Sequence, residues 1–439
     1  MLNDKKISDI NAIAHYCREF QRVEKKLVGH DQAHFHRLRR TAFEAFSTQG
    51  FPNKKQADWK YTSLTTLRQT PYSLVAPTHC NGLSTLEAQH SDYRLVFVNG
   101  FFAAHLSKIA GLPKASLIMN LASMPEQNLE QFNAIWKSNE TPEKNSFTAL
   151  NTAFMQDGAV IYLSANTRLN SPIEILFINT DETSCHFIPL RNIIIAEESS
   201  QATIIEKYID MTPENNTHYF LNTVTDCRLA ENSHIEHYKM INEAKLAQHV
   251  GHLYVTQQKN SQFSGYSLAL SGALIRSDVT VRLLAEQAYC QLKGLYYALG
   301  QQQIDHCTLI DHVSPHTRSE EFYKGIIDDR ARATFNGKLI VRKHAIFSKA
   351  QQLNKNLLLS ARAQVNSKPQ LEILTDDIQC THGASVGQLD KEALFYLRAR
   401  GLTTTEATHL LVQAFIHDIL EQMPLLSDLS LSRLINKTL

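Results

Sequence analysis

The chain lacks the cysteine patterns and apolar runs that would indicate a secreted or membrane protein. Its seven cysteines are an odd number and include no Cys-x-x-Cys pair, so neither a disulfide framework nor a zinc knuckle is indicated. The most apolar runs, at 173–178 and 188–196, are far shorter than the roughly 20 residues that cross a bilayer. The N-terminal stretch MLNDKKISDINAIAHY has no apolar core of signal-peptide length. We therefore expect a soluble protein of the reducing cytoplasm, without membrane contact.

An excess of one charge and the standard catalytic motifs are missing as well. The 44 basic and 43 acidic side chains nearly cancel, which argues against nucleic acid or anionic lipid as a partner. Gly337-Lys338 lacks the upstream glycine of a P-loop, and no G-x-S-x-G, H-E-x-x-H or G-x-G-x-x-G motif occurs. Any nucleotide energy that the protein uses must therefore be supplied by a partner.

What is present is a long series of short β-rich runs between two helical regions. Many runs alternate apolar and polar residues with period two, and no convincing helix separates them. Such a series indicates a large barrel, a propeller or a β-solenoid. The low glycine count of 16 is unusual for many tight turns, so the pattern alone leaves these architectures open. The runs are 93–100, 159–164, 173–178, 202–209, 234–241, 252–258, 264–272, 278–284, 333–341 and 369–377.

The helical regions carry recognisable end signals. The first region contains a predicted helix at 34–46, stopped by Gly50 and Pro52. The loop that follows, 51–64, contains a tryptophan that we interpret as a packing anchor.

The C-terminal region begins with a predicted helix at 390–400 that ends at Gly401. A second helix opens with Thr403 and Glu406 at capping-box spacing. Its apolar residues are predicted to share one face. They are Ala407, Leu410, Leu411, Ala414, Phe415 and Ile419.

Two groups of histidines attract attention but favour a structural interpretation. His30 and His34 have the i, i+4 spacing of two metal ligands, yet with His36 they belong to a basic stretch that is better explained as a solvated face. In the segment 305–316, two of the histidines would lie roughly 20 Å apart if the chain is extended, at about 3.3 Å per residue. We therefore expect this segment to have a structural or interface role.

Cys380 and His382 form a third candidate, with one residue between them. In a strand they would point the same way, with α-carbons roughly 6–7 Å apart, and thiolate and imidazole both suit iron. Two ligands are too few for a stable site, so a metal would be transient or shared with another chain. A catalytic thiol is disfavoured because such thiols usually gain from a helix N-terminus. The alternative is a buried cysteine beside a histidine that bonds a backbone carbonyl, and spacing alone keeps that alternative ahead.

The segments around this pair resemble the SufB/SufD family of iron–sulfur cluster assembly proteins. The segment 369–402 is similar to the C-terminal signature of that family, and 311–341 and 349–365 also resemble it. The segment 51–64 resembles the SufD branch. SufB-type chains carry Glu-His-Glu-Ala where this chain has Thr-His-Gly-Ala at 381–384, and they place a cysteine in the segment matching 348–358, which has none here.

The resemblance implies a fold and a set of partners. It implies a right-handed parallel β-helix core at 92–380, flanked by an N-terminal helical region at 1–91 and a C-terminal one at 381–439. The protein would pair with a SufB-type scaffold protein and bind a SufC-type ABC ATPase through its C-terminal helices. The residues expected to meet the ATPase are Leu394, Phe395, Tyr396, Leu397, Leu410, Leu411 and Phe415.

The resemblance also implies the role of the Cys380–His382 pair. His382, and secondarily Cys380, would bind transient iron or a nascent cluster at an interface shared with the SufB-type chain. This chain would contribute to iron entry, hold no stable cofactor and have no enzymatic activity of its own. A homodimer is possible when the chain is alone.

Two other functions stay open at this point. A β-solenoid hydrolase acting on polysaccharide would need a facing pair of carboxylates, and Asp376 and Asp377 would point opposite ways in a strand. A thiol enzyme built on Cys380 and His382 is the other alternative.

Overall fold

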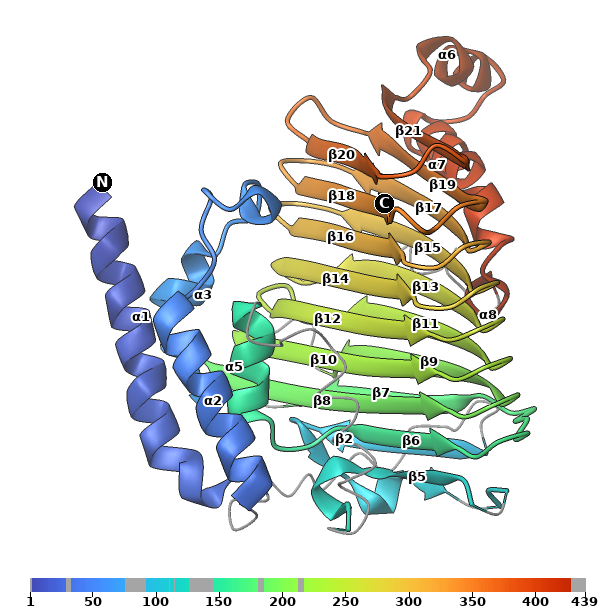
Figure 1. The fold of residues 1–439 in the computed structure, drawn as a ribbon. Helices are drawn as coiled ribbons and strands as arrows, with labels where there is room; N and C mark the ends of the chain where they lie inside the picture. The colour runs from blue at the N-terminus through green and yellow to red at the C-terminus, as the bar shows by residue number, and fades with distance from the viewer. Residues whose placement is uncertain are drawn as a thin grey trace.

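The computed structural model describes residues 2–28, 33–75, 92–109, 111–113, 115–125, 145–180, 185–211 and 217–427. Its centre is a parallel β-solenoid of seven turns, formed by two sheets that face each other (Figure 1). From β6 onward, strands alternate between the sheets along the chain, so each strand pairs in parallel with the strand two places later rather than with the next. The mainly β fold class, with helices in the N- and C-terminal regions, is confirmed.

We name the sheets A and B. The strands of sheet A are β1 (Ser73–Leu74), β5 (Leu117–Asn120), β6 (Ala159–Leu163), β8 (His186–Ala196), β10 (Tyr219–Leu229), β12 (Gln248–Gln257), β14 (Leu274–Leu283), β16 (Gln303–His312), β18 (Arg332–Val341) and β20 (Gln364–Ile373). The strands of sheet B are β2 (Tyr93–Val98), β3 (Phe101–Phe102), β4 (Lys108–Ile109), β7 (Ile173–Asn179), β9 (Gln201–Asp210), β11 (His234–Asn242), β13 (Gln262–Ser271), β15 (Tyr289–Ala298), β17 (Arg318–Ile327), β19 (Ser348–Leu358) and β21 (Ile378–Gln388).

The turns between the sheets explain why so little glycine is needed. Left-handed backbone conformations recur at successive bends, but residues other than glycine occupy them, including Asn166, Asn232 and Asn260 with φ of 61°, 58° and 51°. Asparagine tolerates this region because its short polar side chain can bond locally. The bends also stack, since the Asn232 amide donates to the Lys259 carbonyl of the next bend. The low glycine count therefore did not argue against a solenoid.

The interior of the solenoid is closely packed, and glycine is used there for space. Gly294 pairs in register with Tyr323, and Tyr296 pairs with Gly325. A Cβ on Gly294 would lie 2.1 Å from a Tyr323 ring carbon, so the missing side chain accommodates the ring of the neighbouring turn. Both tyrosines are buried, and they flank the imidazole of His306.

The N-terminal helices pack against one side of the solenoid (Figure 1). They are α1 (Leu2–Val23), α2 (Ala33–Gln49) and α3 (Thr65–Gln69), and α2 ends at Gly50 as predicted, with φ of 63°. A further helix, α5 (Ser146–Phe154), lies inside the region expected to be all β. It is buried throughout, because it fills the space between α2 and the outer face of sheet A.

The segment 51–64 is fastened to sheet A by a buried network. Trp59 stacks on Phe147 at 5.2 Å, and the Arg276 guanidinium lies 3.5 Å from the Trp59 ring centre, so the prediction of a packing anchor is confirmed. The Thr62 hydroxyl accepts from Arg276 at 2.8 Å and donates to the Asp305 carboxylate at 2.6 Å. This segment is therefore held in one position on the solenoid.

The C-terminal region comprises α6 (Lys391–Ala399), α7 (Thr404–Leu420) and α8 (Pro424–Ser427). The capping box of Thr403 and Glu406 is present. The predicted apolar face of α7 was partly wrong, because Leu410 and Ala414 are exposed. The face that packs on the outside of sheet B consists of Val412, Ile416 and Ile419, with Met423 after the helix, and Ala407 is also buried.

The last strand also reaches further than expected. β21 runs to Gln388, beyond residue 380, where the sequence analysis ended the β core, because its backbone pairs with β19 over the whole length of both strands. Among the described residues, no helix is both long enough and apolar enough to cross a membrane.

Candidate functional site

Cys380 and His382 lie on the last strand and face the interior of the solenoid. β21 pairs in register with β19, so that Cys380 lies beside Ala350 and His382 beside Gln352. Ala350 and Gln352 are buried, and Cys380 packs against the central core cluster, which identifies this as the inner face. Because alternate residues of a strand share a face, His382 points inward as well. The predicted common orientation of the pair is confirmed, although the metal-binding role remains a prediction.

The two side chains differ in exposure. His382 is exposed because β21 is the last strand of sheet B and no further turn covers it within the described part of the chain. Cys380 is half-buried, and this burial raises the pKa of its thiol. A raised pKa lowers the thiolate fraction near neutral pH, which is the opposite of what a catalytic cysteine requires. The burial of Cys380 and the raised pKa of its thiol thus weaken the thiol-enzyme alternative.

A stack of buried polar side chains lies directly beneath His382. Gln352 is its register partner, and Glu321 is the partner of Gln352 on β17. The Gln352 amide donates to the Glu321 carboxylate at 2.6 Å, and both side chains are buried. Burial raises the pKa of Glu321 to about 7. The sequence analysis missed these two residues, although polar letters at inward positions of a strand could have signalled them.

The end of the solenoid that carries His382 is open. β20 and β21 are the terminal strands of the two sheets, and neither has a second neighbour among the described residues. Unpaired strand edges are ready to bond another chain. Large apolar side chains are also exposed around this end, namely Phe347, Ile373, Leu374 and Val386. We call this surface the open end, and its chemistry is that of an incomplete interface.

The C-terminal helices present a second apolar surface. Phe395 and Tyr396 on α6 are 74% and 57% exposed, and Leu410 on α7 is 47% exposed. Figure 1 shows α6 projecting past the last strands, away from the body of the solenoid. Leu394, Leu397 and Leu411 are only partly exposed.

Phe415 differs from the other residues expected to meet the ATPase. It is half-buried and packs against the apolar cluster between α7 and sheet B, where its ring lies 4.5 Å from the Lys324 ammonium. Phe415 therefore packs within the chain, between α7 and sheet B.

Two of the histidines at 305–316, His306 and His312, have the structural role allowed by the prediction of a structural or interface segment, whereas His316 is exposed. His306 and His312 lie on β16, face the interior of the solenoid and are buried. Burial lowers the pKa of His306 to about 3 and that of His312 to about 4. His312 is bonded to the hydroxyls of Thr317 and Ser319, each at 2.8 Å. Across the described ranges, no group of three or more His, Cys, Asp or Glu residues could hold a metal ion.

The other sequence candidates are placed as follows. His30 and the side chain of His34 lie outside the described residues, and His36 lies 3.2 Å from Glu24. The sequence analysis treated Asp376 and Asp377 as part of a strand, but they lie in the turn between β20 and β21. β20 ends earlier, at Ile373. Both are exposed and line one shallow hollow of about 340 Å³.

Comparison with known proteins identifies the family to which the chain belongs. The SufBD core domain of the SUF system for iron–sulfur cluster assembly matches residues 177–415, and the SufBD N-terminal region matches residues 10–175. An iron–sulfur cluster assembly SufBD family protein of Synechocystis is 32% identical over 89% of this chain and 87% of its own length.

Two relatives carry the SufD name. The iron–sulfur cluster assembly protein SufD of Escherichia coli is 27% identical over 94% of this chain and 93% of its own length. SufD of Bacillus subtilis is 23% identical over 85% of this chain and 86% of its own length. The chain therefore belongs to the SufBD family of iron–sulfur cluster assembly proteins and is SufD-like.

Proposed function

We propose that this chain is the SufD-type subunit of a cytoplasmic cluster-assembly scaffold, and that it pairs with a SufB-type protein through the open end. The observation that carries the proposal is the position of His382, on the inner face of the last strand and beside an unpaired sheet edge. A second solenoid that abuts this end would satisfy the strand edges and cover the exposed apolar side chains.

Iron or a nascent cluster is the cargo of this site rather than a resident cofactor. The His382 imidazole supplies one nitrogen ligand, and the Cys380 thiol lies two residues away on the same face. Since one or two ligands cannot complete a coordination sphere, the partner must supply the rest. We assign the main role to His382 because the family resemblance points to it. Burial raises the pKa of the Cys380 thiol, which lowers its thiolate fraction near neutral pH and is consistent with a secondary role.

The proposed contribution of this chain is positional and not enzymatic. Gln352, beneath His382, is held in place by its bond to Glu321, and a Cβ on Gly337 would lie 2.1 Å from the Gln352 amide nitrogen. Gln352 therefore has a fixed position next to the register position of His382.

A SufC-type ATPase is proposed to dock on the apolar surface of α6 and the exposed side of α7. Phe395 and Tyr396 on α6 form the centre of this surface, and Leu410 lies on the exposed side of α7. Exposed aromatic residues of this kind typically dominate binding energy at interfaces. The ATPase would supply the nucleotide chemistry for which this chain has no motif.

Co-purification with SufB-type and SufC-type partners tests both contacts. Val386→Arg, at the open end, should abolish retention of the SufB-type partner, while Ile109→Arg, an exposed apolar residue at the other end of the solenoid, should not. Phe395→Ala should release the ATPase, with Met211→Ala as the matched exposed apolar control. Retention of both partners by both test variants would contradict the proposal. A homodimer that dissociates when the SufB-type partner is added would support it.

A further inference from the structure

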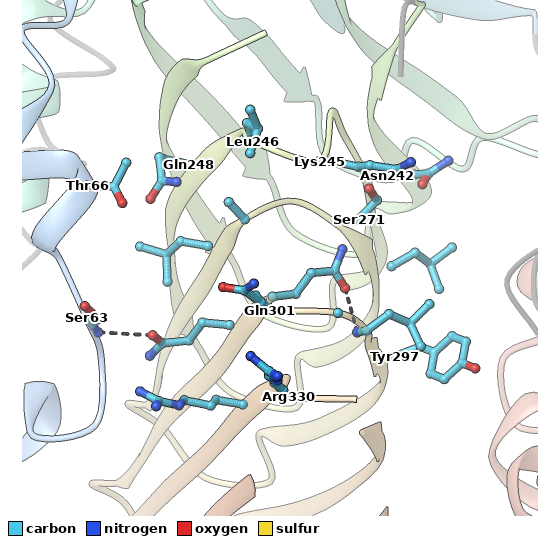
Figure 2. A pocket seen from close by; sticks show the side chains of 18 residues that line it. Ser63, Thr66, Asn242, Lys245, Leu246, Gln248, Ser271, Tyr297, Gln301 and Arg330 are labelled. Carbon is cyan, nitrogen blue, oxygen red and sulfur yellow. Dashed lines mark hydrogen bonds between the residues drawn. The ribbon is translucent and has the colours of Figure 1, made fainter. Parts of the chain in front are cut away.

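A large cavity lies between the N-terminal segment and one side of the solenoid. It has a volume of about 1000 Å³ and is formed between the N-terminal residues Ser63 and Thr66 and four successive bends of the solenoid at 242–248, 270–274, 297–303 and 330–332. Figure 2 shows Ser63 on one side of the cavity, with Lys245, Gln301 and Arg330 on the solenoid side. Cavities of this size bind small molecules.

The charge of the cavity is of one sign. Lys245, Arg330 and Arg332 line it, and none of the described lining residues is acidic. Both arginines are exposed, and neither guanidinium forms an ion pair in the described part of the chain. Asp329, next to Arg330, accepts instead from the Gly300 amide and lines the adjoining hollow. The chain as a whole is almost neutral, so this local excess of positive charge is a feature of the cavity.

The walls of the cavity are fixed before any ligand arrives. Arg332 begins β18 and pairs in register with Gln303 of β16. Both polar atoms of the Gln303 side-chain amide are bonded to the N-terminal segment. The oxygen accepts from the Ser63 backbone amide at 3.2 Å, and the nitrogen donates to the Tyr61 carbonyl at 2.9 Å. The buried bonds of Thr62 hold the opposite wall. Preformed walls lower the entropic cost of binding.

We propose that this cavity binds a small organic molecule that carries two or more phosphate groups. The guanidinium groups of Arg330 and Arg332 can each form paired hydrogen bonds with phosphate oxygens. The rest of the lining is rich in amides and hydroxyls, including Gln248, Gln301 and Ser271, which suit the hydroxyl and amide groups of a polar ligand. A long nucleic acid is disfavoured because the cationic residues lie within concave hollows and the chain as a whole has a net charge of only +1. This inference does not depend on the role of His382.

Calorimetric titration of the full chain at low ionic strength tests the inference, with inorganic pyrophosphate and ADP as probes. We expect saturable binding of both, with Arg330→Gln/Arg332→Gln at least tenfold weaker. The control pair Lys54→Gln/Lys55→Gln removes two exposed cations elsewhere and should change affinity by less than threefold. Tighter binding of ADP than of pyrophosphate would support the organic ligand that we propose.

Three results would overturn the inference. The first is the absence of saturable binding of either probe to the wild-type chain. The second is an equal loss in the arginine pair and the lysine pair, which would identify an adventitious ion only. The third is binding of a single-stranded oligonucleotide that depends on the two arginines while neither small probe binds. Because the arginines are exposed, circular dichroism should show that both pairs of variants are folded.

Discussion

The buried hydroxyl of Thr62 offers a sharp test of how the N-terminal segment is attached to the solenoid. Thr62→Val keeps the shape of the side chain but removes the acceptor for Arg276 and the donor to Asp305, at 2.8 and 2.6 Å. A hydrogen bond to a charged group contributes about 1.5–3 kcal/mol. Arg276 keeps its bond to the Asp58 carbonyl, and Asp305 keeps its bond from Gln303, so part of the loss is compensated. We expect the segment to be destabilised by about 2–4 kcal/mol.

The loss should be local, because the segment 51–64 lies outside the solenoid core. Native-state hydrogen exchange of the amides at 51–69 measures the free energy of local opening directly. A loss of about 2–4 kcal/mol corresponds to exchange that is about 30- to 1,000-fold faster in the variant, at about 1.4 kcal/mol per factor of ten.

A matched control is available in α3, directly after the segment. Thr66→Val changes an exposed threonine and should alter the opening free energy by less than about 0.5 kcal/mol. If Thr62→Val changed exchange by less than threefold, the buried network would not be what attaches the segment to the solenoid. The amides in the solenoid strands, which exchange more slowly, should exchange at the wild-type rate in both variants.

Three further outcomes are expected. Gly294→Ala should lower the free energy of unfolding by about 1–3 kcal/mol, because its Cβ would overlap the Tyr323 ring, whereas Gly387→Ala, with nothing within 4 Å, should have little effect in the same denaturation assay. Glu321→Gln should remove a pH dependence of stability. With its pKa raised to about 7 from 4.5, the folded state keeps a proton that the unfolded state releases, so wild-type stability should fall by roughly 3 kcal/mol between pH 4.5 and 7 relative to the variant. Parallel pH profiles for the two proteins would refute this. His306→Phe should fold and be nearly as stable as wild type by thermal denaturation, because His306 is buried and neutral between two tyrosine rings. A fall of more than about 3 kcal/mol in the free energy of unfolding would show that His306 makes a hydrogen bond that its position does not indicate.

Some of the strands could be located from the sequence because their alternation is local, but β10, β15, β17 and β19 were not among the predicted runs, and the pairing partners could not be predicted. In β13 and β14, for example, period two marks the strands, yet each pairs with a strand two places away along the chain. No internal repeat signals that connection. The helix at 146–154 was missed because the surrounding strands set the expectation, and its burial on all sides hides the helical period.

The orientation of the Cys380–His382 pair could be predicted, but its surroundings could not. Strand geometry alone places both side chains on one face. Which face of β21 is inside depends on its register with β19. The neighbouring residues Glu320 and Glu321 show why this cannot be predicted from residue type: both are glutamates, yet only Glu321 is buried in the interior. The exposure of Leu410 was missed for a related reason, because α7 rotates so that Val412 and Ile416 contact sheet B. The family resemblance, and not the spacing, pointed to His382.

The central claim is that His382 binds iron or a nascent cluster within an assembled complex, and one comparison tests it most directly. The chain is co-expressed with its SufB-type and SufC-type partners, purified without oxygen, and its bound iron and visible absorption are measured for His382→Ala and Thr381→Ala. Thr381 is the exposed neighbour on the opposite face of the same strand, so its loss should leave the cluster signal unchanged. We expect His382→Ala to lose most of the signal while the complex stays assembled. An intact complex with equal cluster content in both variants would contradict the claim.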